Sequence, residues 1–210
     1  MKNLIITVFL IATCSSLLLG QVEYGVKVGG GISELLGEHE DTKELGGHLY
    51  NPTFAYHAGF FAELQFFNYL FFSVDPAFTA FGAHHEYYKP TYNDDPPTLV
   101  TYEDPIERLY FINIPTSVRS NFLFPKWLSI GAGINNAFYL EGISDGIRPY
   151  LIETYHLDFY AVVSFSYKKY MLEIEYFKGL DSLTEKRPYD AHEYFNRAFM
   201  FSLKYTIFGD

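Results

Sequence analysis

Two runs of strictly alternating side chains, joined by a very short turn, lie between Phe54 and Gly82. In the first run, aromatic or apolar residues occupy every second position from Phe54 to Phe66, and the second run repeats the pattern from Leu70 to Ala80. A period of two is typical of a β-strand. Each run exceeds the roughly 5 or 6 residues usual in soluble sheets and reaches the roughly 9 to 11 residues that cross a bilayer at a tilt. The stretch therefore predicts a hairpin of two membrane-spanning strands.

The composition favours the same interpretation. The chain contains 21 Phe and 19 Tyr but one Trp, and aromatic residues make up 20% of it, which is typical of strands that meet lipid and its interfaces. After the leader no apolar run approaches 18 residues, so helical membrane spans are not expected. The formal net charge of -10 argues against a nucleic-acid partner.

The first twenty residues read as an export signal. Lys2 precedes an apolar stretch from Leu4 to Ala12, and small residues follow as far as Gly20. We expect residues 1–20 to be a signal peptide and residues 21–210 to be the mature domain. Lipidation of Cys14, the only cysteine, is a less favoured alternative because the residue before it is an atypical threonine.

Alternation recurs along the rest of the chain and predicts eight strands. Their expected ranges are 22–33, 54–66, 70–82, 109–124, 127–140, 157–167, 170–178 and 194–208. Long polar connections at 34–51, 83–107, 141–156 and 179–193 alternate with tight turns, and prolines such as Pro90 and Pro105 block regular structure in the second. Short periplasmic turns, long extracellular loops and an even strand number are typical of outer-membrane barrels. We therefore predict an all-β fold, an eight-stranded antiparallel up-and-down transmembrane barrel in the cell outer membrane.

A soluble lipocalin-like barrel would alternate as well, and side-chain size decides between the two. One face of the strands consists mainly of Gly, Ser and Ala, which fit a narrow interior, whereas the other carries more Phe and Tyr than an eight-stranded lumen can hold. The bulky face must point outward. An outer wall of Phe, Leu, Ile and Val suits hydrocarbon and would aggregate in water.

The inward face also collects charged residues. Three cationic and four anionic side chains share its parity: Lys27, Arg119, Lys204, Glu63, Asp75, Glu173 and Glu175. In a lumen filled by side chains they should pair, because an unpaired buried charge costs several kcal/mol. We expect a structural ion-pair network that plugs the barrel, with a proton or ion path as the alternative.

Several segments, taken in order, resemble the PorT-type outer-membrane β-barrel family of Bacteroidota. They are 24–30 (YGVKVGG), 57–63 (HAGFFAE), 110–115 (YFINIP) leading to Arg119, 129–133 (SIGAG) and 201–205 (FSLKY). The resemblance implies an outer-membrane location and a barrel fold. It also implies a faint link to secretion of surface proteases, with which one member is associated. Asn113 departs from the acidic residue frequent in the family, and Gly209 and Asp210 follow the aromatic that usually ends such barrels.

Chemistry at specific residues is weakly indicated. A lipid A-modifying enzyme would need a serine, a histidine and an acid near the outer leaflet, and Ser144, Asp145 and His156 lie in or beside one predicted loop without a defining motif. Histidines lie beside carboxylates in the predicted long loops, at 38–40, 84–86, 156–158 and 192–193, but at no spacing typical of a metal site. A loop that binds a metal ion or another ligand is therefore an alternative, like the lipid A-modifying enzyme.

We therefore expect no catalytic residues, no cofactor and no metal site. The sequence favours a non-enzymatic structural or interaction module. Its partners would be outer-membrane lipid and, at the long, acidic, tyrosine-rich loops, a protein or glycan. A PorT-like accessory role in surface-protein secretion is the second hypothesis.

Overall fold

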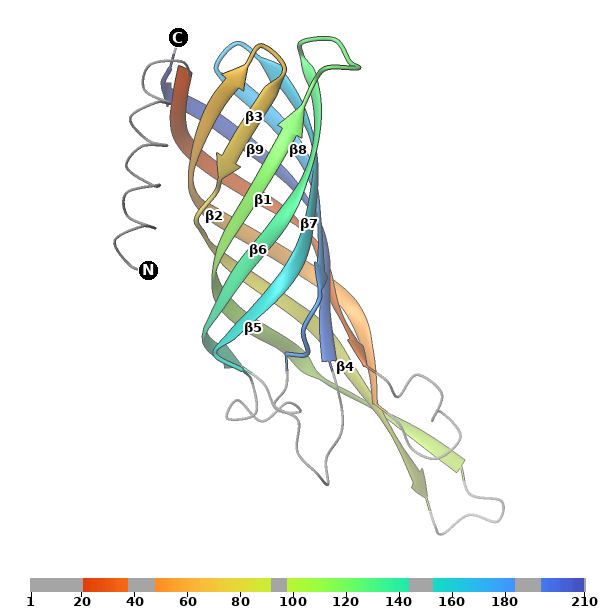
Figure 1. Ribbon diagram of the computed structural model, residues 1–210. Helices are drawn as coiled ribbons and strands as arrows, with labels where there is room; N and C mark the ends of the chain where they lie inside the picture. The colour runs from red at the N-terminus through yellow and green to blue at the C-terminus, as the bar shows by residue number, and fades with distance from the viewer. Residues whose placement is uncertain (1–20, 38–47, 92–97, 144–152, 184–193, 210) are drawn as a thin grey trace.

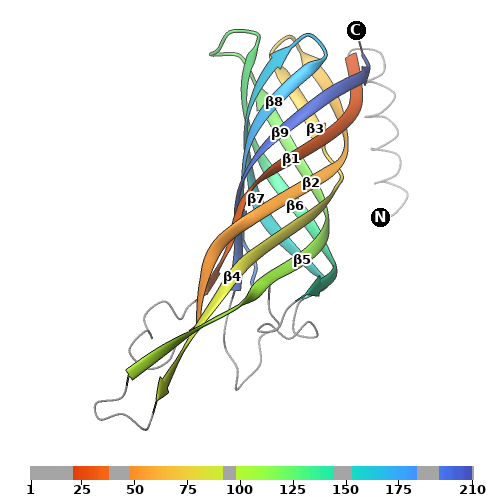
Figure 2. The same ribbon diagram turned by 180° about the vertical axis from the view of Figure 1, so that it is seen from behind.

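The computed structural model describes residues 21–37, 48–91, 98–143, 153–183 and 194–209. Within these ranges the chain forms one antiparallel sheet that curls into a barrel (Figures 1 and 2). Its strands are β1 (Gln21–Gly37), β2 (His48–Phe67), β3 (Leu70–Val74), β4 (Ala77–Thr91), β5 (Thr98–Ser120), β6 (Leu128–Ile143), β7 (Tyr155–Tyr167), β8 (Tyr170–Gly179) and β9 (Tyr194–Phe208). No helix among the described residues has the length and apolar character needed to cross a membrane.

The sheet closes because β1 pairs with β2 on one side and with β9 on the other. Lys27, for example, lies opposite Gly59 of β2 and Lys204 of β9. β3 and β4 are two halves of a single barrel strand, since both pair with β2 and β5. The barrel therefore has eight strands, which confirms the predicted fold.

The third barrel strand was expected to be continuous from 70 to 82, but it is interrupted at Asp75 and Pro76. The reason is that proline has no backbone N–H to contribute to the ladder. The neighbours still bridge the gap: the Phe60 N–H donates to the Pro76 carbonyl and the Asp75 N–H donates to the Pro115 carbonyl, both at 2.9 Å. The register is the same on both sides of the interruption, so Asp75 keeps the inward parity of Ser73 and Ala77, and its side chain is 2% exposed inside the barrel.

The three turns that the structure describes, β2–β3, β5–β6 and β7–β8, lie at one end of the barrel together with the C-terminal end of β9 (Figure 1). We call this the turn end and the opposite end the loop end. The β5–β6 turn is wider than predicted, because β5 stops at Ser120 and β6 starts at Leu128. Backbone hydrogen bonds from Phe124 to Asn121 and from Leu128 to Pro125 shape it.

The prediction that residues 83–107 form a second long loop is wrong for most of this range. β4 continues to Thr91 and β5 begins at Thr98, and these two residues pair in a ribbon that projects beyond the barrel at the loop end (Figure 2). Within the described residues β2 pairs with β4 only as far as Tyr87. There Pro90 has a partner strand on one side alone, and a proline is tolerated at such an edge. Asp104 and Pro105 sit at a register shift in β5, where a bulge also relieves that need.

The other long connections are also shorter than expected. β1 extends to Gly37 and β2 starts at His48, so the first connection is not the whole of 34–51. β6 continues to Ile143. β7 starts at Tyr155, which places His156 in a strand rather than in the third loop.

The faces of the strands sort by size as predicted. Large apolar side chains cover the outer wall, with Phe60 and Phe201 exposed by 66% and 59%, whereas Lys27 and Arg119 are 1% exposed on the inside. Some rings do point inward, and small residues make room for them. A Cβ placed on Gly25 would lie 2.8 Å from the Phe61 ring.

Candidate functional site

The seven charged residues predicted to face inward meet in one buried cluster. They come from β1, β2, the β3–β4 junction, β5, β8 and β9, and none is more than 6% exposed. We call them the charge cluster: Lys27, Glu63, Asp75, Arg119, Glu173, Glu175 and Lys204. The strands bring them together because alternate residues of a closed sheet share the lumen.

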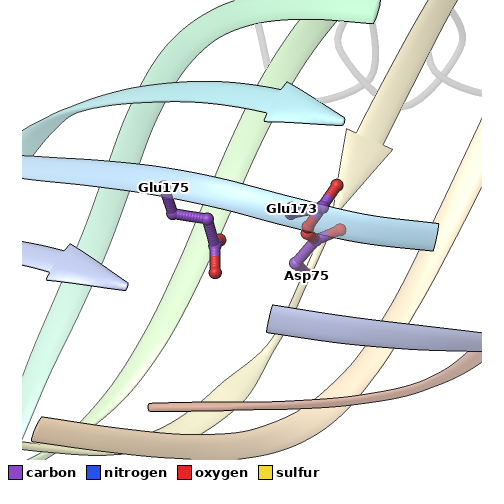
Figure 3. Close-up of side chains that lie close together, drawn as sticks. All are labelled: Asp75, Glu173 and Glu175. Atoms are coloured by element: carbon purple, nitrogen blue, oxygen red, sulfur yellow. The ribbon is translucent and has the colours of Figure 1, made fainter. Parts of the chain in front are cut away.

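Lys27 is the hub of the charge cluster. Its Nζ lies 2.8 Å from Asp75 Oδ2, 3.2 Å from Glu173 Oε2 and 2.6 Å from Glu175 Oε1. Figure 3 shows these three carboxylates gathered around a common space, Asp75 from the β3–β4 junction and the two glutamates from β8. One ammonium thus neutralises charge contributed by segments about a hundred residues apart in the chain.

The other two cations complete the pairing. Lys204 Nζ lies 2.7 Å from Asp75 Oδ2 and 3.0 Å from Glu173 Oε1. The Arg119 guanidinium pairs with Glu63 and, at 3.1 Å, with Glu173. Every carboxylate of the cluster therefore has at least one cationic partner.

Uncharged side chains supply further hydrogen bonds to the cluster. The Tyr160 hydroxyl donates to Glu175 at 2.6 Å, and the Ser202 hydroxyl donates to the second oxygen of the same carboxylate. His57 Nε2 lies 2.7 Å from Ser202 Oγ, and Arg119 donates to Ser164 Oγ at 2.7 Å. Sequence analysis did not single out these partners. The alternation in the sequence indicates that these side chains point inward. It does not give the stagger between strands, which sets the position of each side chain along the barrel axis.

Asp75, Glu173 and Glu175 each offer an oxygen within 4.8 Å of the others, a spacing compatible with a shared metal ion. Here the Lys27 ammonium already contacts all three carboxylates, and Lys204 contacts two of them. Lysine nitrogen therefore satisfies the charge that a metal ion would otherwise balance.

Ser202, His57 and Glu175 combine the residue types of a hydrolytic triad, but not its order. A nucleophilic serine must give its proton to the histidine. The Ser202 hydroxyl instead donates to Glu175, so His57 is the donor toward Ser202 Oγ. All three side chains are buried in the barrel. The arrangement supports cohesion of the interior rather than nucleophilic catalysis.

Aromatic rings fill the interior nearer the loop end. The Phe81 ring lies 5.9 Å from the rings of both Phe111 and Phe177, and the Tyr160 and Phe177 rings lie 5.0 Å apart. Leu109, opposite Phe81 on β5, is 1% exposed. Tyr160 joins this layer to the charge cluster, because its ring packs on Phe177 and its hydroxyl donates to Glu175.

The remaining sequence candidates do not form one site in the described residues. Ser144 and Asp145 lie outside the described residues, as do His39 and His192 and the expected signal peptide. His84 and His85 lie on β4. His156 is fully buried inside the barrel with its Nε2 3.8 Å from Asp158 Oδ1, so it is not on the surface that the enzymatic hypothesis required.

Comparison with known proteins agrees with this architecture. Residues 15–206 match the family model described as outer membrane protein beta-barrel domain. The chain belongs to this family. The protein is accordingly an outer-membrane β-barrel protein, located in the outer membrane. A search of curated protein sequences found no match.

Solved barrels of similar shape are distant in sequence. Ail, the attachment invasion locus protein of Yersinia pestis, solved in complex with the heparin analogue sucrose octasulfate, has a TM-score of 0.46 and 11% identity, covering 90% of this chain and 99% of that chain. OprG of Pseudomonas aeruginosa has a TM-score of 0.41 and 8% identity, covering 90% and 95%. Neisserial surface protein A has a TM-score of 0.38 and 10% identity, covering 88% and 97%.

Proposed function

We propose that this protein is a non-enzymatic outer-membrane barrel with a lumen plugged by side chains, which serves as a structural or interaction module. The observation that carries the proposal is the charge cluster, in which seven side chains, none more than 6% exposed, are linked by ion pairs. A solute crossing the barrel would have to separate these pairs and leave buried charges without partners, at a cost of several kcal/mol.

Conductance in a planar bilayer tests the plugged lumen. The purified protein should give no porin-like current steps, while a general porin in the same bilayer provides the positive control. The variant K27S/E173S/E175S/K204S replaces two acidic and two basic side chains of the charge cluster by the shorter serine, so the net charge of the lumen is unchanged. If these side chains block the lumen, the variant should conduct ions. Stepwise conductance of the unaltered protein at the level of the general porin would refute the proposal.

The interaction role would belong to the loop end, which in outer-membrane barrels faces the medium. The β4–β5 ribbon projects there, and connecting segments that carry function are commonly displayed from a rigid scaffold. Crosslinking on intact cells should recover a protein or glycan with the full chain but not with a variant lacking residues 88–101. Equal recovery by both chains would contradict a role for the ribbon.

The absence of enzymatic activity can be tested directly. Lipid A recovered after incubation of lipopolysaccharide with the protein in detergent should have an unchanged mass. Loss or gain of one acyl chain, abolished by S144A or H156Q, would replace the present proposal with a lipid A-modifying activity.

A second candidate role is that of a PorT-type accessory in surface-protein secretion, supported by the resemblance of 24–30, 57–63 and 110–115 to that family. Deleting the gene and comparing the proteins at the cell surface with those in the medium tests it. An accessory role predicts that a defined set of surface proteins disappears from both, whereas an unchanged surface proteome would exclude it.

A further inference from the structure

A second group of buried polar side chains lies nearer the loop end than the charge cluster. It consists of Asn113 on β5, Asn135 on β6, and His156 and Asp158 on β7, all at most 1% exposed. The strand register makes them neighbours, because Asn135 lies opposite Asp158 and Ala137 lies opposite both Asn113 and His156. We call these four residues the buried polar group.

Two contacts fix the orientation of side chains in the buried polar group. Asn135 Nδ2 donates to Asp158 Oδ2 at 2.6 Å, which leaves Oδ1 on the other side of the carboxylate. The His156 ring packs edge-on against Phe111, with ring centroids 4.9 Å apart and planes at 80°. His156 Nε2 and Asp158 Oδ1 then face each other at 3.8 Å, beyond hydrogen-bond distance.

Several atoms of this group have no hydrogen-bond partner among the described residues. They are both ring nitrogens of His156, Oδ1 of Asp158, Oδ1 of Asn135 and both amide atoms of Asn113. Within the described part of the chain, no lysine or arginine pairs with Asp158, in contrast to every carboxylate of the charge cluster. Buried polar groups are rarely left in this state without an ion or water to satisfy them.

We propose that His156 and Asp158 bind a divalent cation of the zinc class inside the loop end of the barrel. Imidazole nitrogen and carboxylate oxygen are ordinary zinc ligands, at about 2.0–2.2 Å from the ion. Two such ligands of a tetrahedral ion stand about 3.4 Å apart, as those bond lengths require, so the observed 3.8 Å needs an adjustment of only a few tenths of an ångström.

The neighbouring asparagines fit this assignment. Asn135 holds the Asp158 carboxylate in place, the role that hydrogen-bonded partners of metal ligands commonly have. The unpartnered Oδ1 atoms of Asn135 and Asn113 are further oxygen donors on adjacent strands. The site also differs from Asp75, Glu173 and Glu175, where lysine nitrogen supplies the positive charge.

Calorimetric titration of the folded full-length protein in detergent with zinc chloride tests the proposal, and cobalt chloride adds a visible absorption spectrum that reports coordination by nitrogen and oxygen. The unaltered protein should bind one equivalent of each ion. H156Q and D158N should each weaken binding at least tenfold. N135A should weaken it by about 10- to 100-fold, because it removes the hydrogen bond that holds the Asp158 carboxylate.

Two matched variants separate this site from other histidines. H57Q removes a buried histidine of the charge cluster region and should bind zinc like the unaltered protein. A chain with His39, His48, His84, His85 and His192 all replaced by Gln should also retain binding. Migration of the unboiled proteins in SDS gels verifies that each variant is folded. Absence of binding by the unaltered protein, or loss of binding only in the fivefold variant, would overturn the proposal.

Discussion

Lys27 shows how one residue can determine the state of a narrow barrel interior. Its ammonium is 1% exposed and contacts three carboxylates, which come from the β3–β4 junction and from β8. Removing one member of a buried ion pair leaves the other charge without water or partner, which is far more costly than losing an exposed pair.

Replacement of Lys27 by Met should therefore destabilise the folded barrel strongly. The change keeps the length of the side chain but leaves Asp75, Glu173 and Glu175 with less positive charge around them. We expect the free energy of unfolding to fall by about 3–5 kcal/mol, measured by urea titration of protein refolded into lipid vesicles.

The control for this prediction is K126M in the exposed β5–β6 turn. That variant should remain within about 0.5 kcal/mol of the unaltered protein, as is usual for surface positions. Equal stability of K27M and K126M would show that the charge cluster does not hold the interior together.

At this scale the sequence predicts which residues point inward but not which residues meet. Parity alone placed all seven members of the charge cluster inside. Their pairing depends on the stagger of the strands around the barrel, which brings Glu63 of β2 to Arg119 of β5. His156 and Asp158 were missed as an interior pair because the third loop was predicted to reach His156.

Among the secondary-structure elements, the β4–β5 ribbon differs most from its prediction. Prolines and acidic residues between Ala83 and Glu107 indicate a loop when they are read singly. In a two-stranded ribbon, however, each strand has an unpaired edge, where a missing N–H costs nothing and charged residues protect against edge-to-edge association. The strand predictions succeeded where a strand has two partner strands, and they failed in the ribbon, where β4 and β5 pair only with each other among the described residues.

Shortening the ribbon should leave the barrel intact. Tyr87 and Tyr102 pair directly, and β2 ends its pairing with β4 at Tyr87. Residues 88–101 can therefore be replaced by Asn-Gly, which favours a two-residue hairpin turn. The urea unfolding midpoint in vesicles should be unchanged within error. A large decrease in stability would mean that the ribbon supports the barrel through contacts other than strand pairing.

In the whole molecule, apolar and charged side chains are distributed in the opposite way to those of a soluble protein. Phe, Leu, Ile and Val cover the outer wall, and the charge cluster lies within. Sequence predicted this feature best, because it depends on composition and parity rather than on any single contact.

Position along the outer wall should set the cost of a charge placed there. Phe201 lies in the middle of β9, opposite Ile174, and Val22 lies near the turn end of β1. F201R should lower the free energy of unfolding in vesicles by about 2–4 kcal/mol and V22R by about 0–1 kcal/mol, as expected for the bilayer centre and its rim. Equal effects would argue that the wall does not face lipid.

The pairing of β1 with β9 has a consequence for biogenesis. Until the last strand of the chain is available, β1 and the growing sheet each retain an unsatisfied hydrogen-bonding edge, which hydrocarbon does not tolerate. Stepwise insertion of single hairpins is thus disfavoured. The exported polypeptide must instead be kept from aggregating in the periplasm and close its seam as it enters the bilayer, so truncation within β9 should abolish assembly rather than yield a smaller barrel.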